Sequence, residues 1–288
     1  MDIDNLRLQE LKRLANRARR LILETAFTAQ AGSIGGSLSI AEILVALYFQ
    51  ILRIAPSDPT WNQRDRFILS KGHAALALYS VMALRGFLPE EELKTYAAPG
   101  SRLAPGPDMQ ALPGVEMTIS RPGAGLSAGL GMALGTRFHK TACRIYVLIG
   151  DGECQEGQIW EAALAASRYR LDNLVGLLDC NRLQQYGWAG RRGYTSMDRM
   201  PPLENPRAMW ESFGWYVLEV DGHRFPDILS AFATTRQVRG RPTLIVARTV
   251  KGKGISFMEN DYRWHSAKLA EEQLALAVAE LDAEAAGL

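Results

Sequence analysis

Two apolar runs, each followed by polar residues suited to bind a ligand, constrain the fold of this chain most strongly. The first run, residues 145–149, leads into the turn Gly150-Asp151-Gly152, and the second, residues 174–178, is followed closely by Asn181. Short apolar runs bounded by turn residues predict buried strands, and glycine supplies the backbone freedom that the turn needs. Asn181 follows Asp151 by thirty residues, which leaves room for a helix that joins two parallel strands.

Asp151 and Asn181 are therefore expected at the same edge of one sheet. Helix-compatible sequence over residues 156–169 fills the interval, and a right-handed crossover brings the two strand ends side by side. Mg²⁺ prefers oxygen ligands and usually retains phosphate oxygens and water in its shell. The carboxylate of Asp151, the amide oxygen of Asn181 and the backbone carbonyl of Leu183 suit that ion. The sequence thus predicts a site for Mg²⁺ and a diphosphate.

Segments with helical and strand-like periodicity alternate along the chain. The helical segments are residues 6–29, 39–51, 74–84, 125–139 and 157–169, and the strand-like runs are residues 67–69, 145–149, 174–178, 216–220 and 244–247. This order predicts an α/β fold: a doubly wound, mostly parallel sheet with helices on both faces. We expect one domain over residues 1–288, with an extended amino-terminal helix and a carboxyl-terminal helix.

Two irregular stretches, residues 97–123 and 182–206, are rich in Gly and Pro. They are longer than most connections, and long loops in compact domains tend to be functional. Each is interpreted as a loop that folds over a ligand at the carboxyl edge of the sheet or as a subunit contact. The two interpretations are compatible.

The bulk composition argues against several classes of function. Apolar residues make up 47% of the chain and charged residues 22%, as in ordinary globular proteins. A net charge of +2 indicates no nucleic-acid or membrane partner chosen by charge. The acidic start is unlike a signal peptide, and the longest apolar stretch is too short to span a membrane. Because the three cysteines also lack a close pair, we expect a cytoplasmic protein.

The stretch from Gly150 to Gln184 resembles the cofactor motif of the transketolase family of thiamine-diphosphate enzymes, which begins Gly-Asp-Gly and ends with Asn at the spacing seen here. Other segments also resemble the family, namely residues 35–39, 64–73, 113–116, 213–215, 220–223 and 247–254. Nearly the whole chain is similar to the amino-terminal, diphosphate-binding half of transketolase. The similarity is to the form made by organisms that split this enzyme into two polypeptides.

The resemblance implies thiamine diphosphate and Mg²⁺ as cofactors and assigns roles to particular residues. Cofactor contacts are expected from Gly150, Asp151, Gly152, Glu153, Asn181, Leu183, Ser120, Pro122 and His73, of which Asp151, Asn181 and Leu183 hold the metal. The resemblance implies three catalytic residues. His73 and His265 are expected beside the diphosphate and the substrate, and Glu156 is expected at the subunit interface. Each of two assignments has an alternative. His265 is otherwise a surface residue before the last helix, and Glu156 is otherwise a first-turn residue that is stabilised by the helix dipole.

The chemistry of the cofactor also implies a partner. Thiamine diphosphate acts by losing a thiazolium proton, which gives a nucleophilic ylid. In the family, a glutamate of the pyrimidine-binding domain starts this ionisation, and the chain reaches Leu288 without that domain. We therefore expect a carboxyl-terminal transketolase-like subunit that supplies the pyrimidine domain and the glutamate, in an assembly of two copies of each subunit.

Three positions depart from the family pattern near the expected substrate. Ser33 and Gly106 stand where the family has histidines that contact sugar hydroxyls, and Arg121 lies in an altered loop near the thiazolium. If the Arg121 side chain points inward, its planar cation is suited to bind a carboxylate or a phosphate. These candidate substrate residues predict poor use of ordinary ketose phosphates and better use of a 2-oxo acid such as pyruvate.

Two classes of function remain open. The first is one subunit of a transferase that moves a two-carbon ketol or acyl unit to an aldehyde or another acceptor, with sugar phosphates and 2-oxo acids as rival donors. The second is a non-catalytic subunit that binds cofactor or partner. A nucleotide-binding dehydrogenase is disfavoured because no Gly-x-Gly-x-x-Gly follows the first strand.

Overall fold

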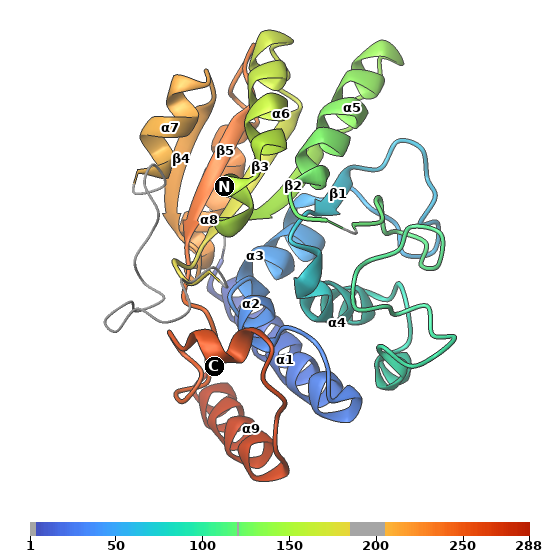
Figure 1. Cartoon of the computed structure of the whole chain (residues 1–288), viewed down its shortest axis with the longest axis vertical. Helices are drawn as coiled ribbons and strands as arrows, with labels where there is room; N and C mark the ends of the chain where they lie inside the picture. The colour runs from blue at the N-terminus through green and yellow to red at the C-terminus, as the bar shows by residue number, and fades with distance from the viewer. Residues whose placement is uncertain (1–3, 120, 185–204) are drawn as a thin grey trace.

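The computed structural model of the chain describes residues 4–119, 121–184 and 205–288. Its sheet runs in the order β1-β2-β3-β5-β4 (Figure 1). The strands are β1 (Arg66–Leu69), β2 (Ile145–Gly150), β3 (Leu174–Cys180), β4 (Tyr216–Asp221) and β5 (Thr243–Arg248). All four pairings are parallel. The predicted α/β fold with a mostly parallel sheet is therefore confirmed.

The central strands are apolar on both sides because helices cover both faces of the sheet. In β2, Tyr146 and Leu148 pack into the core on one face, whereas Ile145, Val147 and Ile149 pack into the core on the other. β3 is buried along its whole length. Parallel sheets are usually covered by helices on both faces, and this is why their strands are near-continuous apolar runs in the sequence.

The helices divide between the two faces (Figure 1). The larger group comprises α1 (Asn5–Ala29), α2 (Ile34–Leu38), α3 (Ala41–Ala46), α4 (Ala75–Arg85) and α8 (Phe225–Thr235). The opposite face carries α5 (Ala124–Phe138), α6 (Gly157–Arg168) and α7 (Pro206–Ser212). None of the helices in the described ranges is long and apolar enough to cross a membrane.

Four of the five predicted helical segments agree with α1, α4, α5 and α6 to within one residue at each end. The fifth, residues 39–51, is divided between α3 and a π-helical turn, Leu47–Ile51. Helices α2, α7 and α8 were not predicted. Helices α7 and α8 each have proline in the first turn, a position where proline is well tolerated.

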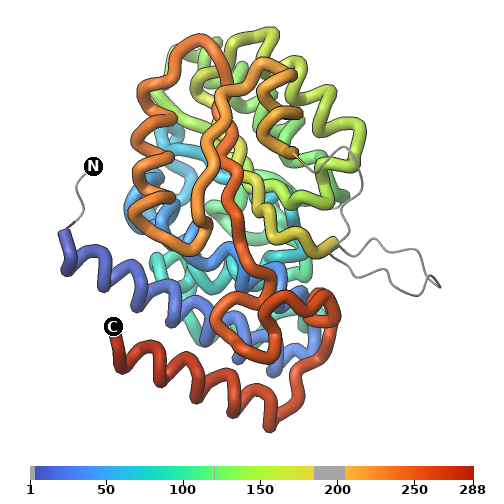
Figure 2. The backbone as a smooth tube through the Cα atoms, turned by 90° about the vertical axis from the view of Figure 1, so that its left-hand side faces the viewer, coloured from blue at the N-terminus to red at the C-terminus, as the bar shows by residue number. Residues whose placement is uncertain are grey.

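The last helix, α9 (Glu271–Ala286), packs against α1 rather than against the sheet. The two helices run antiparallel, as Figure 2 shows, and polar contacts join them. The Asn16 side-chain amide donates to the Leu281 carbonyl at 2.9 Å, and Arg20 pairs with Asp282 at 2.7 Å. The carboxyl-terminal helix thus covers the outside of the larger helical layer.

Short 3-10 turns follow two of the strands at their carboxyl ends. Gly72–Ala74 comes soon after β1, and Gly152–Gln155 comes directly after Asp151. Of the two predicted loops, residues 97–123 contain no helix or strand in their described part, and their last residues reach the carboxyl edge of the sheet. Most of the second, residues 185–204, lies outside the described residues.

Candidate active site

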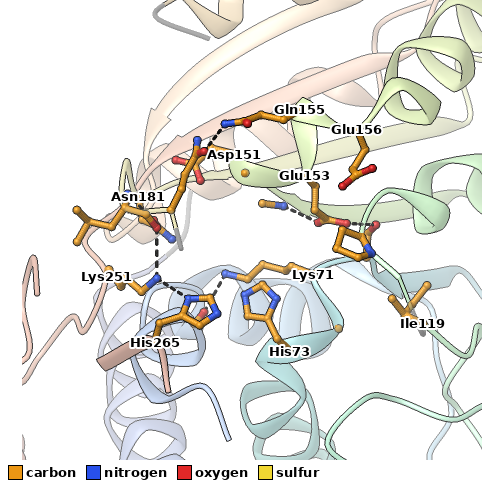
Figure 3. A pocket seen from close by; sticks show the side chains of 18 of the residues that line it. Lys71, His73, Ile119, Asp151, Glu153, Gln155, Glu156, Asn181, Lys251 and His265 are labelled. Atoms are coloured by element: carbon orange, nitrogen blue, oxygen red, sulfur yellow. Dashed lines mark hydrogen bonds between the residues drawn. The ribbon is translucent and has the colours of Figure 1, made fainter. Parts of the chain in front are cut away.

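A cavity of about 740 Å³ opens at the carboxyl edge of the sheet (Figure 3). The segments that follow β1, β2, β3 and β5 all contribute to it, as expected for a ligand site in a parallel α/β fold. Its lining from these segments is Ser70, Lys71, Gly72, His73, Gly150, Asp151, Gly152, Glu153, Gln155, Glu156, Asn181, Leu183, Gln184 and Lys251. Gly36, Ile119, Arg121, Pro122 and His265 complete it.

The structure brings the three predicted metal ligands, Asp151, Asn181 and Leu183, into the lining of this cavity. A carboxylate oxygen of Asp151 accepts from the Arg182 backbone N–H at 2.7 Å, which ties the ends of β2 and β3 together. The Asn181 amide oxygen accepts from the Leu183 N–H at 3.1 Å. No cluster of three or more His, Cys, Asp or Glu side chains suited to a metal occurs among the described residues. The predicted ligand set is not such a cluster, because it consists of one carboxylate, one side-chain amide oxygen and one backbone carbonyl.

Two lysines and two histidines give this cavity a basic wall. The Lys251 ammonium donates to the Leu183 carbonyl at 3.2 Å and lies 2.9 Å from His265 Nδ1. The rings of His265 and His73 are stacked at a tilt of 32°, with centroids 4.9 Å apart. Lys71 lies behind them with its ammonium 2.9 Å from the Gly36 carbonyl. Both predicted catalytic histidines therefore face the same space.

Enclosure and nearby positive charge lower the pKa values of Lys251, His265 and His73. Burial, reinforced by Lys71, lowers the pKa of Lys251 to about 8. Burial and Lys251 lower the pKa of His265 to about 4. Enclosure by the cavity wall and the Lys71 charge also hold the pKa of His73 well below its ordinary value, although its ring is open to the cavity. At neutral pH the wall thus presents ammonium cations and neutral imidazoles, a combination suited to an anionic ligand.

Asp179, fully buried in β3, holds four of the surrounding segments together. One carboxylate oxygen accepts from Ser39 Oγ at 2.8 Å, from the Asn181 amide at 2.9 Å and from the Lys71 ammonium; the other accepts from Thr249 Oγ1. Burial alone would raise the pKa of Asp179, but the Lys71 charge and these hydrogen bonds hold it below its ordinary value. The carboxylate therefore remains charged and fastens the ends of β1, β3 and β5.

Glu153 has a comparable bracing role behind the β2 turn. Its carboxylate accepts from Ser70 Oγ and from the backbone N–H groups of Gly123 and Gly150, each at 2.8 Å. Burial raises the pKa of Glu153. Those donors all belong to the protein, so the geometry favours Glu153 as a brace of the cavity wall. Its predicted contact with the cofactor stays a prediction.

The remaining predicted cofactor and interface residues lie at the rim. Glu156 is exposed at the start of α6 and lines the cavity, which leaves both of its interpretations open. Arg121 and Pro122 are also exposed and line the cavity. Ser120 lies outside the described residues.

Ser33 and Gly106 are not among the lining residues but lie next to some of them. A Cβ atom on Gly36 would lie 3.3 Å from Ser33 Oγ and 3.4 Å from His73 Nε2, so Ser33 lies close to the part of the lining that carries Gly36 and His73. Ser33 Oγ is buried and has no hydrogen-bond partner among the described residues. A Cβ atom on Gly106 would lie 3.1 Å from the Ile119 carbonyl. Substrate contact by either residue stays a prediction.

Sequence reasoning assigned no role to Lys71, Lys251 or Asp179. A signal for the two lysines was present, because each follows a strand-like run as Asp151 does. Applying the strand-end argument to every predicted strand would have placed both at the site. Asp179 directly follows the strand-like run 174–178, so the same argument would have placed it near the site; three of its four partners are distant in sequence, and no pattern marks them.

Fold and site together define an α/β protein with a cavity at the carboxyl edge of its sheet that combines oxygen donors with basic side chains. Residues 10–286 match the family described as "Transketolase, thiamine diphosphate binding domain". The chain belongs to this family.

Similar proteins agree with this placement. The chain is 44% identical over 277 residues to the 6-deoxy-6-sulfo-D-fructose transketolase subunit SqwG of a Clostridium species, covering 96% of this chain and 98% of that protein. It is 40% identical over 281 residues to one subunit of the apulose-4-phosphate transketolase of Phocaeicola vulgatus, covering 98% of this chain and 95% of that protein. The crystal structure of Campylobacter jejuni transketolase superposes with a TM-score of 0.85 at 31% identity, over 99% of this chain and 43% of that one.

These findings confirm the resemblance to the amino-terminal subunit of a split transketolase-like enzyme, and with it the class of transketolase-like transferases. They also confirm a thiamine-diphosphate-binding domain.

Proposed function

We propose that this chain binds thiamine diphosphate together with Mg²⁺ and acts as one subunit of a two-component transketolase. The observation that carries the proposal is the convergence of four strand ends on one cavity, where they place Asp151, Asn181 and Leu183 opposite a basic wall. The first set suits Mg²⁺, and the second neutralises a diphosphate.

The chemistry of the lining fits this cofactor in three respects. Asp151, Asn181 and Leu183 offer the oxygen atoms that Mg²⁺ prefers, and the ion retains room for phosphate oxygens. Lys71 and Lys251 add positive charge beside them. The side-chain Nε2 of Gln184 is a buried donor with no partner among the described residues, and Gln184 lines the same cavity. A phosphate oxygen or a bound water would satisfy that donor.

When bound, thiamine diphosphate supplies a nucleophilic carbon that attacks a carbonyl and stabilises the carbanion that follows. The chain itself contributes orientation, charge and proton transfer. His73 and His265 present neutral imidazoles to the cavity, and we propose that they exchange protons with a hydroxyl of the substrate. Lys251 is proposed to hold the anionic end of the cofactor, and Lys71, paired with Asp179, lies beside it. Glu156, at the rim, is proposed to contact the neighbouring subunit.

A partner subunit is proposed to supply the pyrimidine-binding domain and the catalytic glutamate. Two similar proteins are named as subunits and are matched over nearly their whole length. The full-length Campylobacter transketolase, in contrast, has less than half of its chain matched. We propose two copies of each subunit. No disulfide joins the cysteines of the described residues, which is compatible with the proposed reducing, cytoplasmic setting.

We propose an anionic ketose as the donor of a two-carbon ketol unit. The two similar subunits are named for a sulfonated ketose and a phosphorylated ketose. Ser33 and Gly106 lie beside the lining and not in it, so we do not expect the histidines missing there to prevent binding of a ketose. One observation favours the second candidate, acyl transfer from a 2-oxo acid such as pyruvate, because Arg121 lines the cavity and suits a carboxylate.

The test is a donor comparison in the complex reconstituted with its partner. A sulfonated ketose, a ketose phosphate and pyruvate are each supplied with one aldehyde acceptor, and carbon transfer is followed with and without Mg²⁺. Transfer from either anionic ketose supports the proposal, whereas transfer from pyruvate alone supports the second candidate. Retained cofactor binding without transfer from any donor would instead identify a non-catalytic subunit.

A further inference from the structure

A second buried polar network lies beside the site and contains no residue of the cavity lining. Glu42 of α3 pairs with Arg19 of α1 at 2.5 Å through one carboxylate oxygen. Its other carboxylate oxygen lies 3.0 Å from His223 Nδ1, in the turn after β4. All three side chains are mostly buried, with 3%, 9% and 12% of Arg19, Glu42 and His223 exposed. A buried, fully partnered network of this kind fixes the segments that it joins relative to one another.

Both ends of the network reach the segment that follows β5. The Val250 backbone N–H donates to His223 Nε2 at 2.8 Å, and Arg19 Nε donates to the Lys253 carbonyl at 2.9 Å. Lys251 lies between these two anchored residues and is itself part of the cavity wall. Gly222 lets the turn approach closely, because a Cβ atom there would lie 2.5 Å from Thr249. The network therefore forms hydrogen bonds to the backbone on both sides of Lys251.

The hydrogen bonds also determine where the ring protons lie. Since a backbone N–H can only donate, His223 Nε2 must accept, and the ring proton is on Nδ1, which donates to Glu42. The Lys251 ammonium likewise can only donate, so His265 Nδ1 accepts and the proton of His265 is on Nε2 (Figure 3). The two histidines are thus held in opposite tautomers.

We propose that Glu42 and His223 are positioning residues that hold Lys251 through the Val250 backbone and thereby keep His265 in the Nε2–H tautomer at the cavity. Neither residue contacts the cavity; each acts through the segment that it anchors. The consequence for ligand binding rests on the proposed function, because it assumes that Lys251 and His265 receive the diphosphate. The tautomers follow from the contacts alone.

The first experiment determines the tautomers in the full-length chain, alone and with its partner. The sequence contains four histidines, at positions 73, 139, 223 and 265, so ¹⁵N-histidine NMR spectra can be assigned by single substitutions. We expect the proton of His223 on Nδ1 and that of His265 on Nε2 at neutral pH. The opposite tautomer at either residue overturns the proposal, and the tautomers themselves are read from the wild-type chain, with the variants used only for assignment.

The second experiment measures the affinity for inorganic diphosphate with Mg²⁺, and for thiamine diphosphate with Mg²⁺, by calorimetry. Because His223→Ala removes one anchor, we expect affinity weaker by about fivefold to tenfold, the change that corresponds to losing a hydrogen bond of ordinary strength. The His265 signals should also lose their single tautomer. In His223→Gln the side-chain oxygen can accept from Val250, and most of the affinity should return.

His139→Ala is the matched control, since His139 is exposed at the end of α5 and its replacement should change neither readout. Wild-type affinity together with an unchanged His265 tautomer in His223→Ala would overturn the proposal. If the wild-type chain binds neither inorganic diphosphate nor thiamine diphosphate, with or without its partner, the proposed function fails. The positioning role is then still tested by the tautomers of His223 and His265 in the NMR spectra.

Discussion

At the scale of single residues, the site depends on side chains placed where strands end. Asp151 offers a carboxylate next to the amide of Asn181, and the lysines of the opposite wall lie near enough for Lys251 to contact the Leu183 carbonyl. A cation and an anion can therefore be bound in adjacent positions. The proposed metal site needs the Asp151 charge, because the amide and the carbonyl are neutral.

Replacing Asp151 by alanine should abolish Mg²⁺-dependent binding of thiamine diphosphate. Without the carboxylate, the metal loses its one charged protein ligand and no longer neutralises the diphosphate. Calorimetric titration with and without Mg²⁺ measures the effect. Asp58→Ala is the control, because Asp58 is exposed and precedes β1 on the amino side of that strand. Unchanged Mg²⁺-dependent affinity in Asp151→Ala would refute the metal assignment.

At the scale of elements, Asp179 and Glu42 each join segments that the sheet and helices alone would leave separate. Asp179 fastens the ends of β1, β3 and β5, and Glu42 links α1 and α3 to the turn after β4. In both cases a buried carboxylate is fully partnered. Removing one member of such a set leaves the others buried without compensation.

Asp179→Asn should destabilise the chain by about 3–5 kcal/mol, because it leaves the Lys71 ammonium buried without its counter-charge. Urea unfolding followed by circular dichroism measures the loss. The double variant Lys71→Met with Asp179→Asn should lose less than the sum of the single variants, since the two charges interact directly. Strict additivity in this cycle would mean that the pair does not act as a unit.

Glu42 gives a prediction for the dependence of stability on pH. Although burial opposes ionisation, Arg19 and His223 lower the pKa of Glu42 to about 2. A carboxylate whose pKa is lower in the folded chain than in the unfolded chain stabilises the fold above the unfolded value, and this stabilisation is lost as pH falls through the folded value. Its contribution should therefore be present above about pH 4.5 and disappear toward about pH 2.

Glu42→Gln tests this pH dependence. The variant should be less stable at pH 6, and its unfolding free energy should change less between pH 5 and pH 3 than that of the wild type. The comparison uses urea unfolding at a series of pH values, with the exposed substitution Asp58→Asn as the control. Equal slopes for Glu42→Gln and wild type in that window would contradict the assigned ion pair.

At the scale of the whole molecule, the cavity is proposed to be completed by another subunit. Its described wall supplies oxygen donors and basic groups, and the proposed chemistry also needs a glutamate that activates the pyrimidine ring. Arg121, Pro122 and Glu156 lie exposed at the rim, where a neighbouring chain would meet them. The assembly is therefore the expected unit of activity.

The purified chain alone should show no ketol or acyl transfer, and activity should appear when the partner subunit is added. Product formation is measured over a range of partner concentrations, and the assembled mass is measured by light scattering. We expect activity to saturate as a complex with two copies of each subunit forms. Robust turnover by the chain alone would rule out the need for a partner.

The strands, most helices and the main ligand-binding turn were predictable from sequence because they depend on local pattern. Apolar runs and helical periodicity reflect which faces are buried, and the Gly150 to Gly152 turn lies at the end of one such run. The spacing of Asp151 and Asn181, together with the rule that parallel strands end at one edge, sufficed to bring these residues together. The family resemblance then supplied the candidates His73 and His265.

Only the tertiary structure decided how those groups are held. Lys71 meets Asp179 across 108 residues of sequence, and His223 meets Glu42 across 181 residues, so no local pattern marks either pair. The sequence showed residues 220–223 only as a segment similar to the family, and the structure shows which carboxylate and which backbone N–H His223 joins. The physical reason is that local pattern determines which residues are buried, whereas the partners of a buried polar group depend on the packing of elements far apart in the chain.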